Sequence, residues 1–197
     1  MARTRSYHHG NLRAALLESA ERTLGRRGAG ELSLRELARE VGVSHAAPRR
    51  HFADKQALLD ALAEEGFDRL GRELSGAMAA AGDSLREQLG AFARAYVAFA
   101  TRHAALLELM FAGKHRPGAD RLRDAADAAF AGPLALFASA QASGELVGGD
   151  PERVGTVAWA TLQGLASLAN NGIVGEEDLD ELVDETVDRL IDGLRPR

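Results

Sequence analysis

The sequence predicts an all-α fold of about nine helices. Apolar residues recur every three or four positions along most of the 197 residues, and no stretch shows the sustained two-residue alternation of a strand. Residues that cap helices stand where most of the periodic segments begin. The composition, 46% hydrophobic and 27% charged, gives a chain of this length enough apolar material for a core without disulfides.

The first helices are marked by periodicity and by caps. One helix is expected over about residues 11–27, where leucine or alanine recurs every fourth residue. Ser33 and Glu36 match the S-x-x-E pattern of a capping box, in which each side chain is expected to satisfy a free backbone donor of the next helix. Gly42 supplies the tight turn that ends this short helix. Ser44 is expected to cap a third helix, whose first turns tolerate Pro48.

Capping residues mark the later helices as well. Asp54 is expected to cap a long helix, residues 84–87 form a second S-x-x-E box, and residues 150–151 place a cap before a first-turn proline. Pro133 is expected to bend the helix that contains it. The later helices are expected to begin near residues 54, 84, 106, 120, 150 and 176.

Charge divides the chain into two parts. Residues 1–55 hold eleven Lys or Arg and six Asp or Glu, a net charge of +5, so the rest of a chain with a total of −5 carries −10. A basic N-terminal part favours a head that reads nucleic acid on a body that avoids it, although chance clustering gives the same division. We expect a head over residues 1–55 and a body over residues 56–197, joined by a linker helix over about residues 54–76.

Several classes of protein are disfavoured. The chain has no cysteine, which excludes disulfides, thiolate metal sites and cysteine nucleophiles. It has no apolar run long enough to cross a membrane and no secretory signal at its start, so the cytoplasm is the expected location. It carries no H-E-x-x-H, no G-x-S-x-G and no phosphate-binding glycine loop. We therefore expect no enzyme, no catalytic residue, no metal and no cofactor.

Residues 34–44 read as two short helices around a glycine-containing turn, with Ala38 small enough for the helices to cross closely. Such a helix-turn-helix places its second helix in the major groove of DNA. An ordinary helical hairpin is the alternative, and the basic charge of this part of the chain favours DNA binding.

The head resembles the N-terminal domain of the TetR family over residues 7–62. The resemblance rests on Tyr7-His-His-Gly-Asn-Leu-Arg, on the helix-turn-helix itself and on the family's recognition-helix pattern S-x-x-A-x-Y-x-H-F-x-x-K. That pattern matches at Ser44, Ala47, His51, Phe52 and Lys55. Arg49 stands where the family usually has a tyrosine that touches a DNA phosphate, a contact that arginine makes with charge.

Position assigns the DNA-contacting roles. Base edges are expected to be reached from the first turn of the recognition helix, by Ser44, His45 and Ala46. His45 is the main candidate for base readout, and Ala46 suits a thymine methyl group. Phosphate contacts are expected from Ser33, Arg35, Arg49, Arg50 and Lys55. The alternative for Arg49 and Arg50 is a merely solvated face, whereas His51 and Phe52 are expected to brace the head.

The N-terminal arm carries His8 and His9, a pair that the family often has. A metal site or a tag is disfavoured, because adjacent residues in an arm do not readily share one ion. The arm, with Arg3 and Arg5, is expected either to lie near the DNA backbone or to be disordered.

The body resembles the family's helical regulatory domain. Residues 159–164, Trp-Ala-Thr-Leu-Gln-Gly, are similar to the W-x-x-x-H-G pattern of one branch, with Gln163 in place of histidine, so only a neutral hydrogen-bonding role is carried over. An inducer pocket is expected, mostly apolar, for an apolar or amphipathic ligand. Its expected lining is Phe92, Tyr96, Phe99, His103, Met110, Phe111, Phe130, Phe137, Trp159 and Gln163. Aromatic stripes at helical spacing also form ordinary core, which is the alternative.

The last two helices are expected to pair with those of a second copy, since the resemblance implies a four-helix bundle across a two-fold axis. The expected interface residues are Ala158, Leu162, Leu165, Ala166, Ala169, Leu182, Val183, Val187 and Leu190. The alternative is that both helices cap the core of their own protomer.

The expected function is a ligand-responsive regulator, a homodimer that binds double-stranded operator DNA and is released by a small-molecule inducer, with no membrane partner. In this mechanism the ligand changes the separation of the recognition helices. A ligand-independent architectural DNA binder and an activator are the alternatives.

Overall fold

The computed structural model describes residues 12–196, which form eight α-helices and two 3₁₀ turns and contain no strand. The predicted all-α class is therefore confirmed. Residues 1–11, with His8 and His9, lie outside the described residues. In chain order the elements are α1 (Leu12–Arg27), η1 (Ala29–Glu31), α2 (Leu34–Val41), η2 (Pro48–Arg50), α3 (Lys55–Ala80), α4 (Leu85–Arg102), α5 (Ala104–Gly113), α6 (Asp120–Ala142), α7 (Pro151–Asn170) and α8 (Glu176–Leu194).

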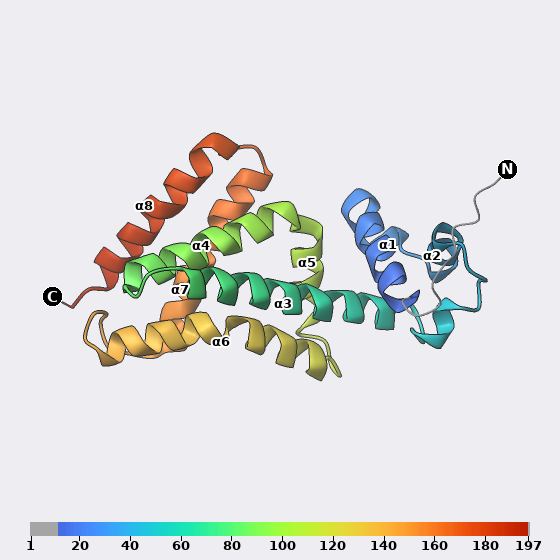
Figure 1. The fold of residues 1–197 in the computed structure, drawn as a ribbon, viewed down its shortest axis with the longest axis horizontal. Helices are drawn as coiled ribbons and strands as arrows, with labels where there is room; N and C mark the ends of the chain where they lie inside the picture. Colours follow the sequence, from blue (N-terminus) through green and yellow to red (C-terminus); the bar gives the residue numbers. More distant parts are fainter. Residues whose placement is uncertain (1–11, 197) are drawn as a thin grey trace.

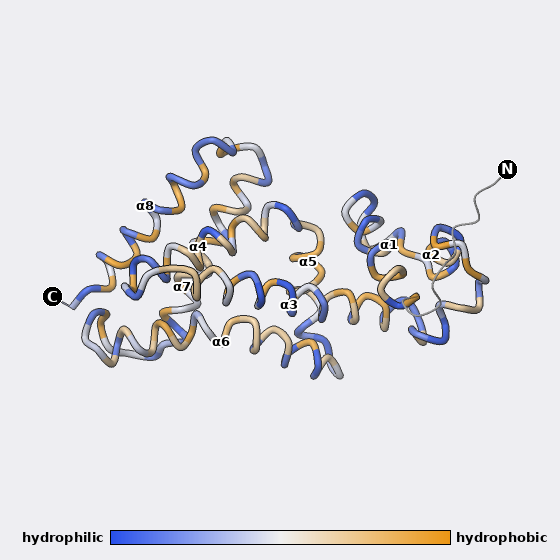
Figure 2. Tube along the Cα trace, in the orientation of Figure 1, coloured by the Kyte–Doolittle hydropathy of each residue, from blue (hydrophilic) through white to orange (hydrophobic). Residues whose placement is uncertain are grey.

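The helices form a small head and a larger body, joined by α3 (Figure 1). The head consists of α1, α2 and the segment that follows α2, packed around buried leucines of α1 and Phe52. In the body, α3 is central and packs against α4, α5 and α6, while α7 and α8 cover the far side of α4. The outer helices are amphipathic, as the alternating polar and apolar colours along α8 show in Figure 2.

The segment after α2 does not form the recognition helix that the sequence predicts. An α-helix capped by Ser44 needs the N–H of residue 48 to donate to the Ser44 carbonyl, and Pro48 has none. The Ser44 carbonyl instead accepts a hydrogen bond from Ala47 at 2.9 Å, and the chain continues through the single 3₁₀ turn Pro48–Arg50. The expectation that Pro48 costs little hydrogen bonding was wrong, because it stands where the first helical bond should form.

Three of the five predicted caps are confirmed, those at Asp54, Ser84 and Asp150. The side chains of Asp54 and Asp150 accept hydrogen bonds from the first turns of α3 and α7, and Ser84 forms the complete box with Glu87. Hydrogen bonds from Ser84 lower the pKa of the Glu87 carboxyl. Ser33 makes no side-chain cap on α2, so the first predicted box is absent.

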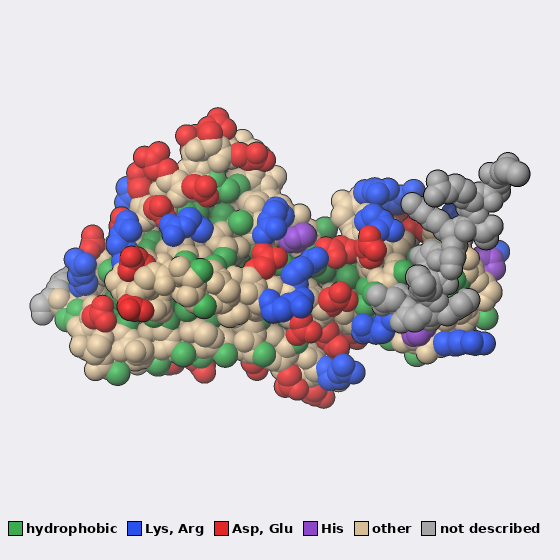
Figure 3. Space-filling model, in the orientation of Figure 1, with side chains coloured by type: hydrophobic (Ala, Val, Ile, Leu, Met, Phe, Trp, Pro, Cys, Tyr) green, Lys and Arg blue, Asp and Glu red, His purple; other side chains and the backbone are tan. Residues whose placement is uncertain are grey.

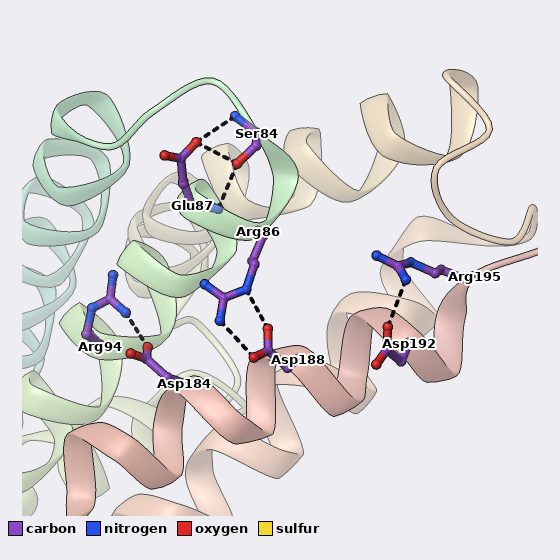
Figure 4. Close-up of polar contacts among 8 residues, drawn as sticks. All are labelled: Ser84, Arg86, Glu87, Arg94, Asp184, Asp188, Asp192 and Arg195. Atoms are coloured by element: carbon purple, nitrogen blue, oxygen red, sulfur yellow. Dashed lines mark hydrogen bonds and ion pairs between the residues drawn. The ribbon is translucent and has the colours of Figure 1, made fainter.

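Ion pairs fix α8 against α4 (Figure 4). Arg86 donates to both carboxylate oxygens of Asp188, at 2.6 and 2.7 Å, and this hydrogen bonding lowers the pKa of Asp188. Arg94 makes a second pair with Asp184, one turn earlier on α8. These contacts orient α8, so that Val183 and Val187 face the body's own core.

A close approach between α3 and α6 depends on Gly71. An added Cβ at Gly71 would lie 3.1 Å from the Cα of Ala129, closer than ordinary packing allows. Helix α6 continues unbroken across Pro133, and the bend expected there stays a prediction. None of the described helices combines the length and the apolarity needed to cross a membrane.

Candidate functional site

The candidate DNA-reading face lies on the head, on α2 and the segment 43–50. Ser44, His45 and Ala46 are exposed in the turn that precedes η2, and Arg49 and Arg50 are exposed within η2. All five side chains are therefore available to a partner, although a turn rather than a helix carries the three expected at base edges.

A hollow of about 570 Å³ lies between the start of α2 and this turn. Ser33, Arg35 and His45 line it, so the fold brings together three of the residues expected to contact DNA. Arg39 also lines the hollow, although the sequence interpretation omitted it. It follows Arg35 by four residues on α2, so helical spacing predicts that the two guanidinium groups share a face. On the visible face of the head in Figure 3, Lys and Arg side chains occur at several places, while Asp and Glu side chains gather over α8.

Lys55 has an internal partner. Its ammonium group donates a hydrogen bond of 2.6 Å to the carbonyl of Gly30, in η1. The side chain is half-buried and ties the start of α3 to the loop between α1 and α2. One of the three N–H donors of Lys55 is therefore used within the head, and the side chain braces the head in addition to any contact it makes with a phosphate. The guanidinium of Arg13 lies 5.7 Å from the centre of the Phe52 ring and braces the same region.

The body contains a cavity of about 700 Å³ between α4, the end of α5, α6 and α7, hereafter the body cavity. Its volume is within the range of small-molecule sites. Five of the residues predicted for the inducer pocket line it: Phe92, Phe111, Phe130, Phe137 and Trp159. The aromatic stripes thus converge from four helices on one space.

Tyr96 and Gln163 lie behind this lining. The indole N–H of Trp159 donates to the Tyr96 hydroxyl at 2.7 Å, and that hydroxyl donates to Oε1 of Gln163 at 2.6 Å. Burial raises the pKa of Tyr96 well above its ordinary value, and the hydrogen bond from Trp159 offsets this only in part. Tyr96 therefore stays a neutral phenol, which holds the Trp159 ring in place.

Phe99, His103 and Met110 do not line the body cavity, contrary to the prediction. Phe99 follows Tyr96 on α4 by one turn, and His103 follows it by two turns as the residue that caps the end of α4. Both therefore lie at the junction between body and head. Met110 is fully buried against α3, with its sulfur 2.7 Å from where a Cβ on Gly66 would stand. Periodicity identified all three as inward-facing but not which neighbour they face.

Four polar residues of the lining were absent from the prediction: Lys114, Asp127, Glu152 and Thr156. Asp127 and Glu152 are exposed and Lys114 is half-buried, so the charged groups stand at the edge of the cavity. A signal for two of them was present, because Asp127 and Thr156 each precede a lining aromatic residue by three positions.

The junction between head and body is built on Glu21 of α1. Arg69 of α3 donates to both oxygens of its carboxylate, at 2.7 and 3.3 Å, and the guanidinium lies 5.6 Å from the Phe99 ring centre. Nδ1 of His103 is 3.5 Å from Glu21. Burial and the Arg69 charge lower the pKa of His103, and the Glu21 charge offsets this only in part. Nε of Arg69 is buried without a partner among the described residues, so loss of the Glu21 carboxylate would leave this guanidinium with still fewer partners.

Most residues predicted for the dimer interface face their own protomer. Six of the nine are buried within the single chain, which leaves them no surface for a partner: Ala158, Leu162, Leu165, Ala166, Val183 and Val187. Ala169, Leu182 and Leu190 are half-buried. The outer face of α7 instead exposes apolar side chains, with Val157 at 58% and Leu168 at 38% exposure, and Ile173 follows at 70%. Both faces of α7 are apolar, so its pattern alone did not separate them.

Two family models match the chain and identify one family. The family model described as bacterial regulatory proteins, tetR family, matches residues 16–62, and the model described as tetracyclin repressor-like, C-terminal domain, matches residues 89–194. A comparison with curated proteins found no match.

Solved structures show the same fold. A protein with unknown function from Rhodococcus sp. RHA1 is 46% identical, with a TM-score of 0.89 over 98% of this chain and 100% of that one. A TetR-family transcription regulator from Marinobacter aquaeolei VT8 shares the fold at 19% identity, with a TM-score of 0.77 over 94% and 96% of the two chains. A putative TetR-family transcriptional regulator from a Rhodococcus species does so at 22% identity, with a TM-score of 0.69 over 91% and 97%.

Proposed function

Because the chain belongs to the tetR family of bacterial regulatory proteins, we propose that it is a homodimeric repressor that a small molecule releases from operator DNA. The observation that carries this proposal is the pairing of two features in one chain. An exposed set of arginines and His45 lies on the head, and an aromatic cavity of about 700 Å³ lies in the body.

The head reads DNA through its exposed turn and grips phosphates through its arginines. Arg49 and Arg50 project from η2, and Arg35 and Arg39 lie on the same side of α2. Guanidinium groups suit phosphate oxygens because they donate several hydrogen bonds in one plane. Since Ser33 makes no cap, its hydroxyl and the first amides of α2 remain for a phosphate at the positive end of that helix. His45 in the preceding turn supplies base readout.

Dimerisation uses the outer faces of α7 and α8. Val157, Gly164 and Leu168 form an exposed strip of small and apolar residues along α7. Leu182 and Leu190 supply half-buried apolar positions on α8. Burying such a strip against a second copy is favourable, and two-fold pairing sets the two heads apart. Successive major grooves on one face of DNA require a separation of about 34–36 Å.

Helix α4 couples the cavity to the head. Phe92 lines the cavity, Tyr96 holds Trp159, and Phe99 lies against the Arg69 side chain that binds Glu21 of the head. A ligand that shifts α4 therefore acts on the same junction that orients α1. Helix α3, which belongs to both head and body, transmits the shift to the DNA-reading face. The ligand lowers DNA affinity only to the extent that it prefers the altered arrangement.

Footprinting of the DNA upstream of the protein's own gene tests the proposal. Wild-type protein should protect two segments whose centres are about 10–10.5 base pairs apart, or a multiple of that. Arg50→Ala should weaken binding to all sequences and reduce the salt slope by about 1, whereas His45→Ala should change base preference. Arg72→Ala removes an exposed arginine of the body and serves as the matched control. Uniform protection without spaced segments would favour an architectural DNA binder instead.

A further inference from the structure

We propose that the body cavity binds an organic cation with an aromatic or bulky apolar body. The inference concerns the chemistry of the cavity, and it rests on the proposed function only in identifying this ligand as the inducer.

The walls of the cavity suit positive charge. Five aromatic rings line it, and the face of each ring carries partial negative charge that attracts a cation within about 6 Å. The protein already places one cation there, because Nζ of Lys114 lies 5.2 Å from the centre of the Phe111 ring. A ligand cation of suitable size can therefore replace the interaction that the Phe111 ring makes with Lys114.

The uncharged donors of the lining are already used. The Trp159 N–H donates to Tyr96, and the hydroxyl of Thr156 donates to the Glu152 carbonyl at 2.7 Å. What remains for a ligand is a set of acceptors: ring faces, the lone pairs of the Thr156 oxygen and two carboxylates. Lys114 is the one remaining donor side chain in the described lining. An anionic or carbonyl-rich ligand would find few partners here, whereas a cation finds several.

The charged residues of the lining also favour a cationic ligand. These residues are Asp127 on α6, Glu152 on α7 and Lys114, so the lining carries a net charge of −1. None of the ion pairs among the described residues involves either carboxylate. Glu152 lies in the first turn of α7, where the helix dipole favours a carboxylate in any case. Asp127 lies beyond the first turn of α6, where the helix dipole gives a carboxylate less support, and it remains available to a positively charged ligand.

The test uses tetraphenylphosphonium and tetraphenylborate, two ions of nearly equal shape and opposite charge. Trp159, the one tryptophan of the chain, lines the cavity and reports binding by its fluorescence in the absence of DNA. The phosphonium should change this fluorescence saturably and bind more tightly than the borate.

Three variants separate charge from shape. Asp127→Asn with Glu152→Gln should weaken phosphonium binding roughly three- to thirtyfold, as expected for two exposed charges. Lys114→Met should strengthen it, because a competing cation is removed. Glu65→Gln with Asp83→Asn removes the same charge from exposed positions outside the lining and should leave binding unchanged.

Tighter binding of the borate, lost in Lys114→Met, would overturn the proposal in favour of an anion site. Equal binding of both ions, or no saturable signal from the phosphonium, would also overturn it. Release of upstream DNA by the phosphonium is measured separately. Tight binding at the cavity without release would contradict the inducer mechanism and leave the chemistry of the cavity standing.

Discussion

Replacing Tyr96 by phenylalanine tests how the wall of the body cavity is held. The substitution removes one oxygen, which accepts a hydrogen bond from Trp159 and donates one to Gln163. Two hydrogen bonds contribute about 1 kcal/mol each, and a donor left without a partner in a partly buried site costs about 1–3 kcal/mol. These contributions overlap, so we expect the free energy of unfolding to fall by about 1–3 kcal/mol.

Urea and thermal denaturation followed by Trp159 fluorescence measure this loss. For a protein of this size each 1 kcal/mol lowers Tm by about 2–4 °C, so the expected decrease is about 2–12 °C. A double-mutant cycle with Gln163→Met isolates the Tyr96–Gln163 bond, since its coupling energy excludes effects that the single changes share. Unchanged stability of Tyr96→Phe, or a coupling energy near zero, would refute the reasoning that these bonds hold the wall.

Three further changes test other parts of the fold. Glu21→Gln should lower the free energy of unfolding by about 1–2 kcal/mol, because it leaves the Arg69 charge without its partner. Glu18→Gln on the same helix breaks an exposed pair and should cost at most about 0.5 kcal/mol. Equal losses in denaturation would contradict a special role of the junction. Since the pKa of His103 is lowered in the folded state, the unfolded chain takes up a proton more readily once the pH falls below the ordinary value of 6.5. Tm should therefore decline below that pH, and His103→Gln should flatten this part of the plot of Tm against pH. Identical plots for the two proteins would exclude the effect. Gly71→Val should lower the free energy of unfolding by about 1–3 kcal/mol through a clash with α6, as measured by denaturation. The same change at Gly76 should cost less, because nothing lies within 4 Å of an added Cβ there. The reverse order would contradict the close approach of α3 to α6.

Local chemistry made most helices predictable. Caps such as Asp54 and the box at Ser84 act within four residues, so they are visible in sequence and are present in the structure. The predicted recognition helix is absent for an equally local reason, because Pro48 has no N–H to donate the first helical hydrogen bond. Pro48 is visible in the sequence, but its spacing of four residues from Ser44, which removes the first helical hydrogen bond, was not taken into account.

The site depends on packing between distant segments, which spacing alone does not determine. Phe92, Phe130 and Trp159 belong to three helices, and only the fold brings them around one cavity. Asp127 and Glu152 were missed because a charge on an exposed helix face looks ordinary until the neighbouring helix is known. Helix α7 is apolar on two sides, so the sequence predicted a pairing helix but assigned its inner residues to the partner.

The affinity of the wild-type protein for its own upstream DNA, measured at physiological salt against excess competitor DNA, tests the central claim most directly. The account predicts binding that survives the competitor, with an advantage over scrambled DNA of at least about 10³, and that is lost in the double variant His45→Ala, Arg50→Ala. Binding that the competitor abolishes, or that the double variant retains, would contradict sequence-specific recognition through the head.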